Sequence, residues 1–133
     1  MDRDAAAAFL TRHARLLDRL RFALLTGTGG PGVAEAMLAA LAGYRNADGG
    51  YGWGIEPDLR DQTSQPAGAL HAFEVLAELP ATVPGAQRHA EHLCNWLDRV
   101  ARPDGGLPFA LPVASPAGVA PFWAGADPTS SSL

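Results

Sequence analysis

The sequence contains no lysine and a single cysteine, and each of these scarcities is informative. All ten basic residues in the 133-residue chain are arginine. We attribute the missing lysine to coding bias in a GC-rich, bacterial genome rather than to function. The lone Cys94 excludes an internal disulfide framework and fits a reducing compartment.

The chain also lacks a surplus of positive charge and any long apolar run. Its 14 acidic residues outnumber the ten arginines, which gives a net charge of −4. This balance argues against a nucleic-acid partner and against attraction to an anionic membrane. No run approaches the roughly 20 apolar residues that cross a bilayer, and the start "MDRDAAAAFL" lacks the features of a signal peptide. We therefore predict a cytoplasmic protein without an integral membrane segment.

What the sequence does contain is typical of one ordinary domain, residues 1–133. Hydrophobic residues make up 47% of the chain, which is ample for a core. Apolar residues recur at three- and four-residue spacing, and the predicted helices cover residues 4–25, 33–44, 63 or 64 to 79, and 86–101. β-branched residues are sparse and no strand alternation is present, so the predicted fold class is all-α.

A glycine-rich stretch, "YRNADGGYGWGIEPDLRDQTSQP" over residues 44–66, separates the second and third predicted helices. A plain connection between helices needs about 2–8 residues, so this stretch is expected to build or repeat a structure. Thr63 or Ser64 could cap the third helix, because a hydroxyl can accept from free backbone N–H groups. Pro66 is tolerated in the first turn.

The stretch is repeated later in the chain. "YRNADGG" has a counterpart in "VARPDGG", which places Asp48 and Asp104 at equivalent points, 104 − 48 = 56 residues apart. Further on, "DQTSQP" from Asp61 matches "DPTSSS" from Asp127. Helical-hairpin repeats bury their apolar faces only against neighbours. We therefore expect an incomplete portion of a longer repeat protein, with possible self-association through exposed terminal helices.

The segment "DGGYGWGIEPDLRDQTSQPAGALHAFEVL" resembles the glycine-rich repeats of the terpenoid (squalene) cyclases and protein prenyltransferase β subunits. The resemblance covers about residues 41–133 and implies an α/α toroid, present here as its N-terminal portion. It also implies an isoprenoid or another apolar ligand in a central cavity. Related toroids include carbohydrate-processing enzymes and non-catalytic binding modules, so a helical-repeat scaffold and a carbohydrate enzyme stay open as alternatives.

The candidate catalytic residues are the acidic side chains of the loop, Glu56, Asp58 and Asp61. The resemblance suggests that crowded carboxylates could keep one acid protonated for transfer to an alkene. However, "EPDLRD" departs from the Asp-x-Asp-Asp signature of such cyclases and includes Arg60. Asp61 could instead stabilise the start of the third helix through the helix dipole.

The candidate substrate-binding residues are Tyr51, Trp53, His71 and Trp123. Aromatic rings at a cavity mouth could bind an isoprenoid chain, steady a carbocation or stack on a sugar. The alternative is that these rings fill gaps between helices. His71 becomes a cavity residue if the third predicted helix is an inner one.

No metal or cofactor is predicted. Protein prenyltransferases bind zinc through Asp, Cys and His, and Cys94 lies near His89 and His92 in this sequence. Their positions do not follow the zinc-bearing pattern of that family. A partly buried histidine and an apolar cysteine explain them better.

Overall fold

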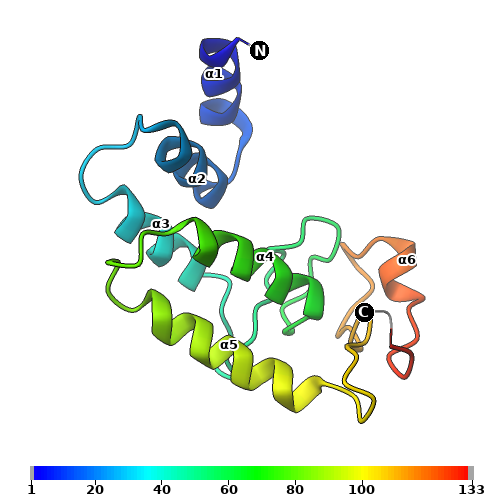
Figure 1. Ribbon diagram of the computed structural model, residues 1–133. Coiled ribbons are helices and arrows are strands. Elements are labelled where there is room, and N and C mark those ends of the chain that lie inside the picture. The colour runs from blue at the N-terminus through cyan, green and yellow to red at the C-terminus, as the bar shows by residue number, and fades with distance from the viewer. Residues whose placement is uncertain (1, 132–133) are drawn as a thin grey trace.

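The fold is all-helical, as the sequence predicts. The computed structural model describes residues 2–131, and this part of the chain contains helices and isolated bridges but no β-strand. Figure 1 shows the arrangement of the helices along the chain. Their bounds are α1 Arg3–His13, α2 Leu16–Thr26, α3 Val33–Ala42, α4 Pro66–Glu78, α5 Ala86–Val100 and α6 Pro121–Ala124.

The prediction of one helix over residues 4–25 is wrong, because the helix is interrupted at Ala14 and Arg15, which separate α1 from α2. Ala14 and Arg15 both adopt extended backbone conformations, with ψ of 156° and 157°. The break lets α2 pack against α3 while α1 projects away from the other helices (Figure 1). Helical periodicity continues through both segments, so the sequence pattern alone gives no sign of the break.

Helix α1 lies at the edge of the molecule. Asp2 caps it by accepting hydrogen bonds from the backbone N–H groups of Asp4 and Ala5, at 3.0 and 3.1 Å. The helix has no buried residue, and Phe9 is 63% exposed. Self-association through this helix stays a prediction.

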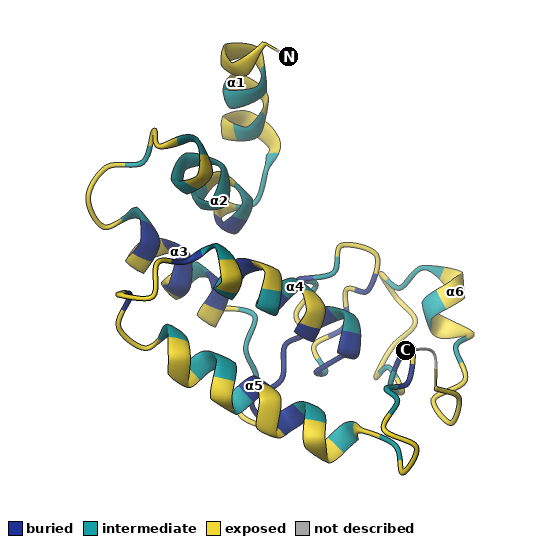
Figure 2. Cartoon of the chain, viewed as in Figure 1, coloured by how far each residue is buried: buried dark blue, intermediate teal, exposed yellow. Residues whose placement is uncertain are grey.

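The core lies between α2, α3, α4 and α5 (Figure 2). Met37 and Leu41, one helical turn apart on α3, are completely buried. Leu17 of α2 and Leu93 of α5 join the same cluster. The apolar stripes predicted on these helices therefore face one another.

Helix α4 begins at Pro66, two or three residues later than predicted, and it lacks the predicted hydroxyl cap. Gln65 occupies the N-cap position and makes no side-chain capping bond. The hydroxyl of Thr63 instead donates to Asp61, and that of Ser64 donates to Asp48. Both hydroxyls organise the preceding loop rather than the helix.

The chain after α5 packs against the glycine-rich loop as irregular backbone, with the short α6 inserted. The side-chain oxygen of Gln65 accepts from the backbone N–H of Leu111 at 2.8 Å, and its nitrogen donates to the Leu111 carbonyl at 3.1 Å. The sequence did not predict α6, which spans four residues. None of the described helices combines the length and the hydropathy that crossing a membrane requires.

Candidate functional site

The glycine-rich loop starts with a tight turn centred on Asp48. The Asn46 N–H donates to the Gly50 carbonyl at 2.9 Å, and Gly49 adopts a φ of +94° that favours glycine. The Asp48 carboxylate accepts from the Gly50 N–H at 2.9 Å and from the Ser64 hydroxyl at 2.8 Å. This one side chain therefore holds the start of the loop against its end.

The second glycine turn repeats the first. The Arg102 N–H donates to the Gly106 carbonyl at 2.9 Å, and Gly105 has a φ of +85°. Asp104 accepts from the Gly106 N–H at 3.0 Å and from the Ser131 hydroxyl. The repeat recognised in the sequence is thus a repeat of hydrogen-bonded turns.

The two repeats differ by one residue in the spacing between their second aspartate and the serine that bonds back to the turn. Asp61 and Asp127 each accept from the N–H and hydroxyl of the threonine two residues later. The serine that reaches back to the turn is then Ser64 in the first repeat, three residues after its aspartate. In the second it is Ser131, four residues after its aspartate.

A cavity of about 570 Å³ opens on the loop. Its walls come from Arg15 at the start of α2, the loop and the irregular segment before α6. It is lined by Arg15, Tyr44, Trp53, Gly54, Pro57, Arg60, Asp61, Gln62, Ala114, Ser115 and Ala117. Of the sequence-predicted site residues, only Trp53 and Asp61 are brought together here.

Trp53 is held in an unusual backbone conformation. Its φ is +56°, the one positive value among the non-glycine residues of the described chain. The residue is 55% exposed, and its indole N–H donates to the Asn46 side-chain oxygen at 2.7 Å. Such backbone strain persists only where the surroundings fix it, and it occurs often at binding sites.

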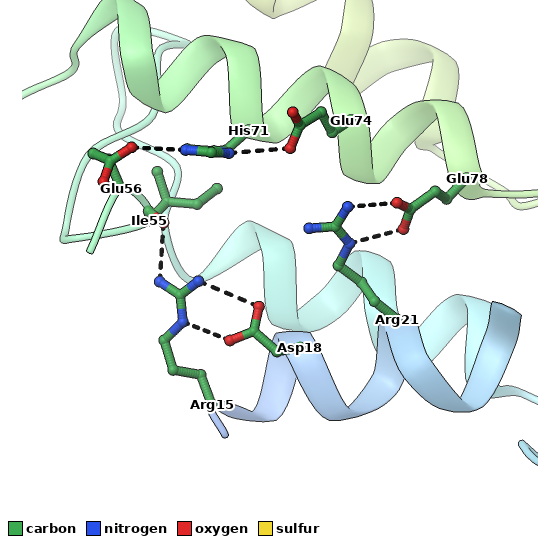
Figure 3. Close-up of polar contacts among 8 residues, drawn as sticks. All are labelled: Arg15, Asp18, Arg21, Ile55, Glu56, His71, Glu74 and Glu78. Carbon is green, nitrogen blue, oxygen red and sulfur yellow. Dashed lines mark hydrogen bonds and ion pairs between the residues drawn. The ribbon is translucent and has the colours of Figure 1, made fainter. Parts of the chain in front are cut away.

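Arg15 ties α2 to the loop. Its Nε donates to Asp18 at 2.8 Å, and its Nη1 donates to the Ile55 carbonyl at 2.9 Å (Figure 3). Nη1 also donates to the Gly54 carbonyl at 2.9 Å. The guanidinium also lies 5.9 Å from the centre of the Tyr44 ring. Arg15 therefore supports the cavity wall with most of its donors already used. Hydrogen bonding to Asp18, which outweighs the opposing effect of burial, raises the pKa of Arg15 further.

Arg60 is a cationic residue of the cavity whose Nη1 and Nη2 groups make no hydrogen bond within the described chain. Its Nε donates to the Pro57 carbonyl at 3.1 Å, and no ion pair to it occurs among residues 2–131. Sequence reasoning treated Arg60 only as a neighbour of the acidic residues. The signal that could have singled it out is its position between Asp58 and Asp61 in the repeat loop.

The three predicted catalytic carboxylates do not converge. Glu56 accepts from the Asp58 N–H at 3.1 Å and contacts His71. Asp58 is exposed at the surface and does not line the cavity. The Asp61 carboxylate is bound by Thr63 and by the backbone at Ala114 and Ser115, away from Glu56 and Asp58. Their catalytic role stays a prediction, without a shared site to support it.

Asp61 is buried, with 5% of its surface exposed. Besides Thr63, it accepts from the backbone N–H groups of Ala114 and Ser115, at 3.0 and 3.4 Å. Burial would raise the pKa of Asp61, but the hydrogen bonds to Thr63, Ser115 and Ala114 outweigh it and lower the pKa. Asp61 is therefore an ionised anchor that fixes one cavity wall to another.

His71 lies outside the cavity, between two carboxylates. Its Nε2 is 2.8 Å from Glu56 and its Nδ1 is 3.1 Å from Glu74 (Figure 3). Beside this group, Arg21 of α2 pairs with Glu78 of α4. Burial lowers the pKa of His71, but the hydrogen bonds to Glu56 and Glu74 outweigh it, so the pKa is raised above 6.5.

Tyr51 and Trp123 lie away from the cavity. Tyr51 is fully buried, and its hydroxyl lies 2.8 Å from Nδ1 of His89. Burial raises the pKa of Tyr51 to about 12, so the phenol stays protonated. Trp123 stacks on Phe109 with ring centres 4.3 Å apart. Tyr51 therefore fills space within the core, whereas Trp123 is a partly exposed ring beside Phe109. A substrate-binding role for either ring stays a prediction.

No metal centre is evident at the candidate zinc residues. Within residues 2–131 no three His, Cys, Asp or Glu side chains cluster in a way that could hold a metal ion. Cys94 is exposed, whereas His89 is half-buried beside Tyr51. The thiol and this imidazole therefore lie in different environments.

No family model, curated protein or solved structure matches the chain. The candidate site therefore stands on its own geometry.

Proposed function

We propose that this chain belongs to a helical-hairpin repeat protein of the prenyltransferase and terpenoid-cyclase type. The support is the equivalence of the Asp48 and Asp104 turns. A further support is that Arg99, near the end of α5, donates to the Asp48 carbonyl. The first turn therefore lies beside the end of α5 from which the second turn starts, as stacked helical hairpins require.

We further propose that the large cavity binds an isoprenoid carrying an anionic group, such as a prenyl diphosphate. The observation that carries this proposal is the cavity itself, in which the exposed Trp53 ring lies with the unpaired Arg60 guanidinium. The indole and the Tyr44 ring can contact an apolar chain, and an arginine suits phosphate oxygens through its forked donors.

Binding is better supported than proton transfer. An acid that protonates an alkene must keep its proton at working pH, whereas Asp61 is held ionised by hydrogen bonds from its surroundings. Glu56 is engaged by His71. The non-catalytic helical-repeat module is therefore the favoured alternative to an enzyme.

The test is a calorimetric titration of the protein with geranyl diphosphate and with farnesyl diphosphate. Farnesol and a disaccharide serve as separate ligands. Trp53→Asn removes the ring with a residue that tolerates a left-handed backbone, and Arg60→Gln removes the charge. Arg12→Gln, on the exposed part of α1, is the matched charge control.

The proposal predicts saturable diphosphate binding that both cavity variants weaken about tenfold or more. Arg12→Gln should bind as the unaltered chain does. If Arg60→Gln weakens the binding of the diphosphates but not that of farnesol, Arg60 contacts the diphosphate group. Binding of the disaccharide alone would favour a carbohydrate site, and no saturable binding of any ligand would overturn the proposal. Incubation with squalene and the diphosphates, followed by product analysis, separates an enzyme from a binding module.

A further inference from the structure

A second, smaller cavity of about 210 Å³ lies between the first glycine turn and α5. It is lined by Arg45, Ala47, Asp48, Gly49, His92, Asn95 and Arg99. The large cavity does not involve these basic residues. The question is what two arginines, a histidine and an asparagine do together in one hollow.

The contact between Arg45 and His92 fixes which groups are donors. A guanidinium only donates, so Nδ1 of His92 must accept from Nη2 of Arg45. The neutral ring then carries its proton on Nε2, which is a further donor. Nε of Arg45 is buried without a hydrogen-bond partner among the described residues. A buried donor in this state is unfavourable until an acceptor reaches it.

The positive charge of this hollow is not neutralised by a neighbouring carboxylate. Within the described chain neither Arg45 nor Arg99 forms an ion pair, and Arg99 donates only to the Asp48 backbone carbonyl. The Asp48 carboxylate is engaged by Ser64 at 2.8 Å and by the Trp96 indole at 3.1 Å. The cavity therefore presents donors and cationic groups, and its one lining carboxylate, Asp48, is held by Ser64 and Trp96 rather than by an arginine.

The pKa of the neighbouring His89 is also affected by the positive charge of Arg45. Burial lowers the pKa of His89, and the positive charge of Arg45 lowers it further. Only the Arg45 contribution bears on the sign of a ligand's charge, because burial disfavours a charge of either sign. This agrees with the donor arrangement, which stands independently on the geometry.

We propose that this hollow is a binding site for a phosphate group. Arg45 and Arg99 supply charge-assisted donors, which are shorter and stronger than neutral hydrogen bonds. His92 and the Asn95 amide supply neutral donors at the edge. The proposal is separate from the isoprenoid cavity and does not depend on it, because the two cavities share no lining residue.

The test is calorimetric titration of the 133-residue chain with inorganic phosphate and, separately, with glycerol 3-phosphate at low ionic strength. Arg99→Gln is the first variant, because Arg99 is exposed and its loss leaves the core intact. Arg45→Gln is the second. Arg88→Gln is the matched control, since Arg88 is also exposed on α5 but does not line the cavity. Thermal unfolding of each variant verifies that it is folded.

The expected result is saturable binding that Arg99→Gln weakens about tenfold and Arg88→Gln leaves unchanged. Stronger binding of the ester than of inorganic phosphate would identify a phosphorylated molecule as the ligand, and the reverse order would identify the free anion. The proposal is overturned if neither probe binds saturably, or if Arg88→Gln weakens binding as much as Arg99→Gln does. It is also overturned if folded Arg99→Gln and Arg45→Gln both bind normally.

Discussion

The imidazole of His71 on α4 lies 2.8 Å from the carboxylate of Glu56 in the glycine-rich loop. The loop is thereby tied to a core helix through a group that titrates near neutral pH. Glu74 lies on the other side of the ring at 3.1 Å. The strength of this connection therefore depends on the protonation of His71.

We predict that His71 makes the stability of the fold depend on pH. Because its folded-state pKa is raised above 6.5, its contribution is fully present below pH 6.5 and is lost as the pH rises through the raised pKa. His71→Gln should remove this step. The measurement is the free energy of unfolding in urea at several pH values between 5 and 9.

The comparison must be made as a difference between proteins, because His89 acts in the opposite direction. The lowered pKa of His89 means that its contribution is lost as the pH falls below 6.5. This loss occurs in His71→Gln as well, so it cancels in the difference. His13→Gln, on exposed α1, is the control. A His71→Gln curve parallel to that of the unaltered protein would contradict the prediction.

Asp61 and Asp58 are predicted to differ in their effect on stability. Asp61→Asn weakens the bonds of a buried carboxylate to Thr63, Ala114 and Ser115, so we expect a loss of about 1–3 kcal/mol. Asp58→Asn alters an exposed side chain and should change little. Urea unfolding of both variants gives the comparison. A larger loss for Asp58→Asn would show that the acidic side chains are assigned wrongly.

Asp61 is also expected to make the free energy of unfolding fall at acid pH. The pKa of Asp61 is lowered in the folded chain, so its contribution is present above its unfolded pKa of about 3.9. It is lost as the pH falls through the lower folded value. Between pH 5 and pH 2, Asp61→Asn should therefore lose less stability than the unaltered protein. Equal losses in the two proteins would contradict this.

The helices and the repeat were largely predictable from sequence, because both depend on local information. The apolar spacing of α3 and α5 gave their positions to within two residues, since a helix face repeats every 3.6 residues. The turns at Asp48 and Asp104 were recognisable from their Asp-Gly-Gly sequences, in which Gly49 and Gly105 adopt the positive φ that favours glycine. Each of these features is set by residues close together in the chain.

The break before α2 and the cavity were not predictable, because distant residues determine them. Arg15 is held by the carbonyls of Gly54 and Ile55, about forty residues along the chain. One cavity wall is irregular backbone at Ala114, fixed by Asp61. Periodicity carries no information on such contacts. Only Trp53 of the predicted aromatic site residues lines this cavity.

The two equivalent turns are predicted to respond differently to the same substitution. Asp48→Ala leaves the buried Ser64 hydroxyl and Trp96 indole without their acceptor, so we expect a loss of about 1–3 kcal/mol in the free energy of unfolding. Asp104→Ala removes bonds to Gly106 and the exposed Ser131, which water can replace. Thermal unfolding should show a lower midpoint for the first variant only. A greater effect at Asp104 would contradict the assignment.

Gly68 on α4 is predicted to be irreplaceable by alanine. An added Cβ would lie 2.3 Å from the Tyr51 carbonyl oxygen and 3.3 Å from an Ile55 methyl carbon. Alanine favours a helix over glycine by about 1 kcal/mol, but overpacking against rigid backbone typically costs about 1–3 kcal/mol. Because the obstructing atom belongs to the main chain of the loop, it cannot rotate away. We therefore expect Gly68→Ala to be destabilising overall.

The measurement is the urea midpoint of Gly68→Ala, with an unchanged slope as evidence that the folded and unfolded states remain comparable. Gly30→Ala is the control, since a Cβ at Gly30 meets no atom within 4 Å. That variant should unfold at the same midpoint as the unaltered chain or slightly above it. If Gly68→Ala were as stable as Gly30→Ala, α4 could not lie as close to the Tyr51 backbone as the structure places it.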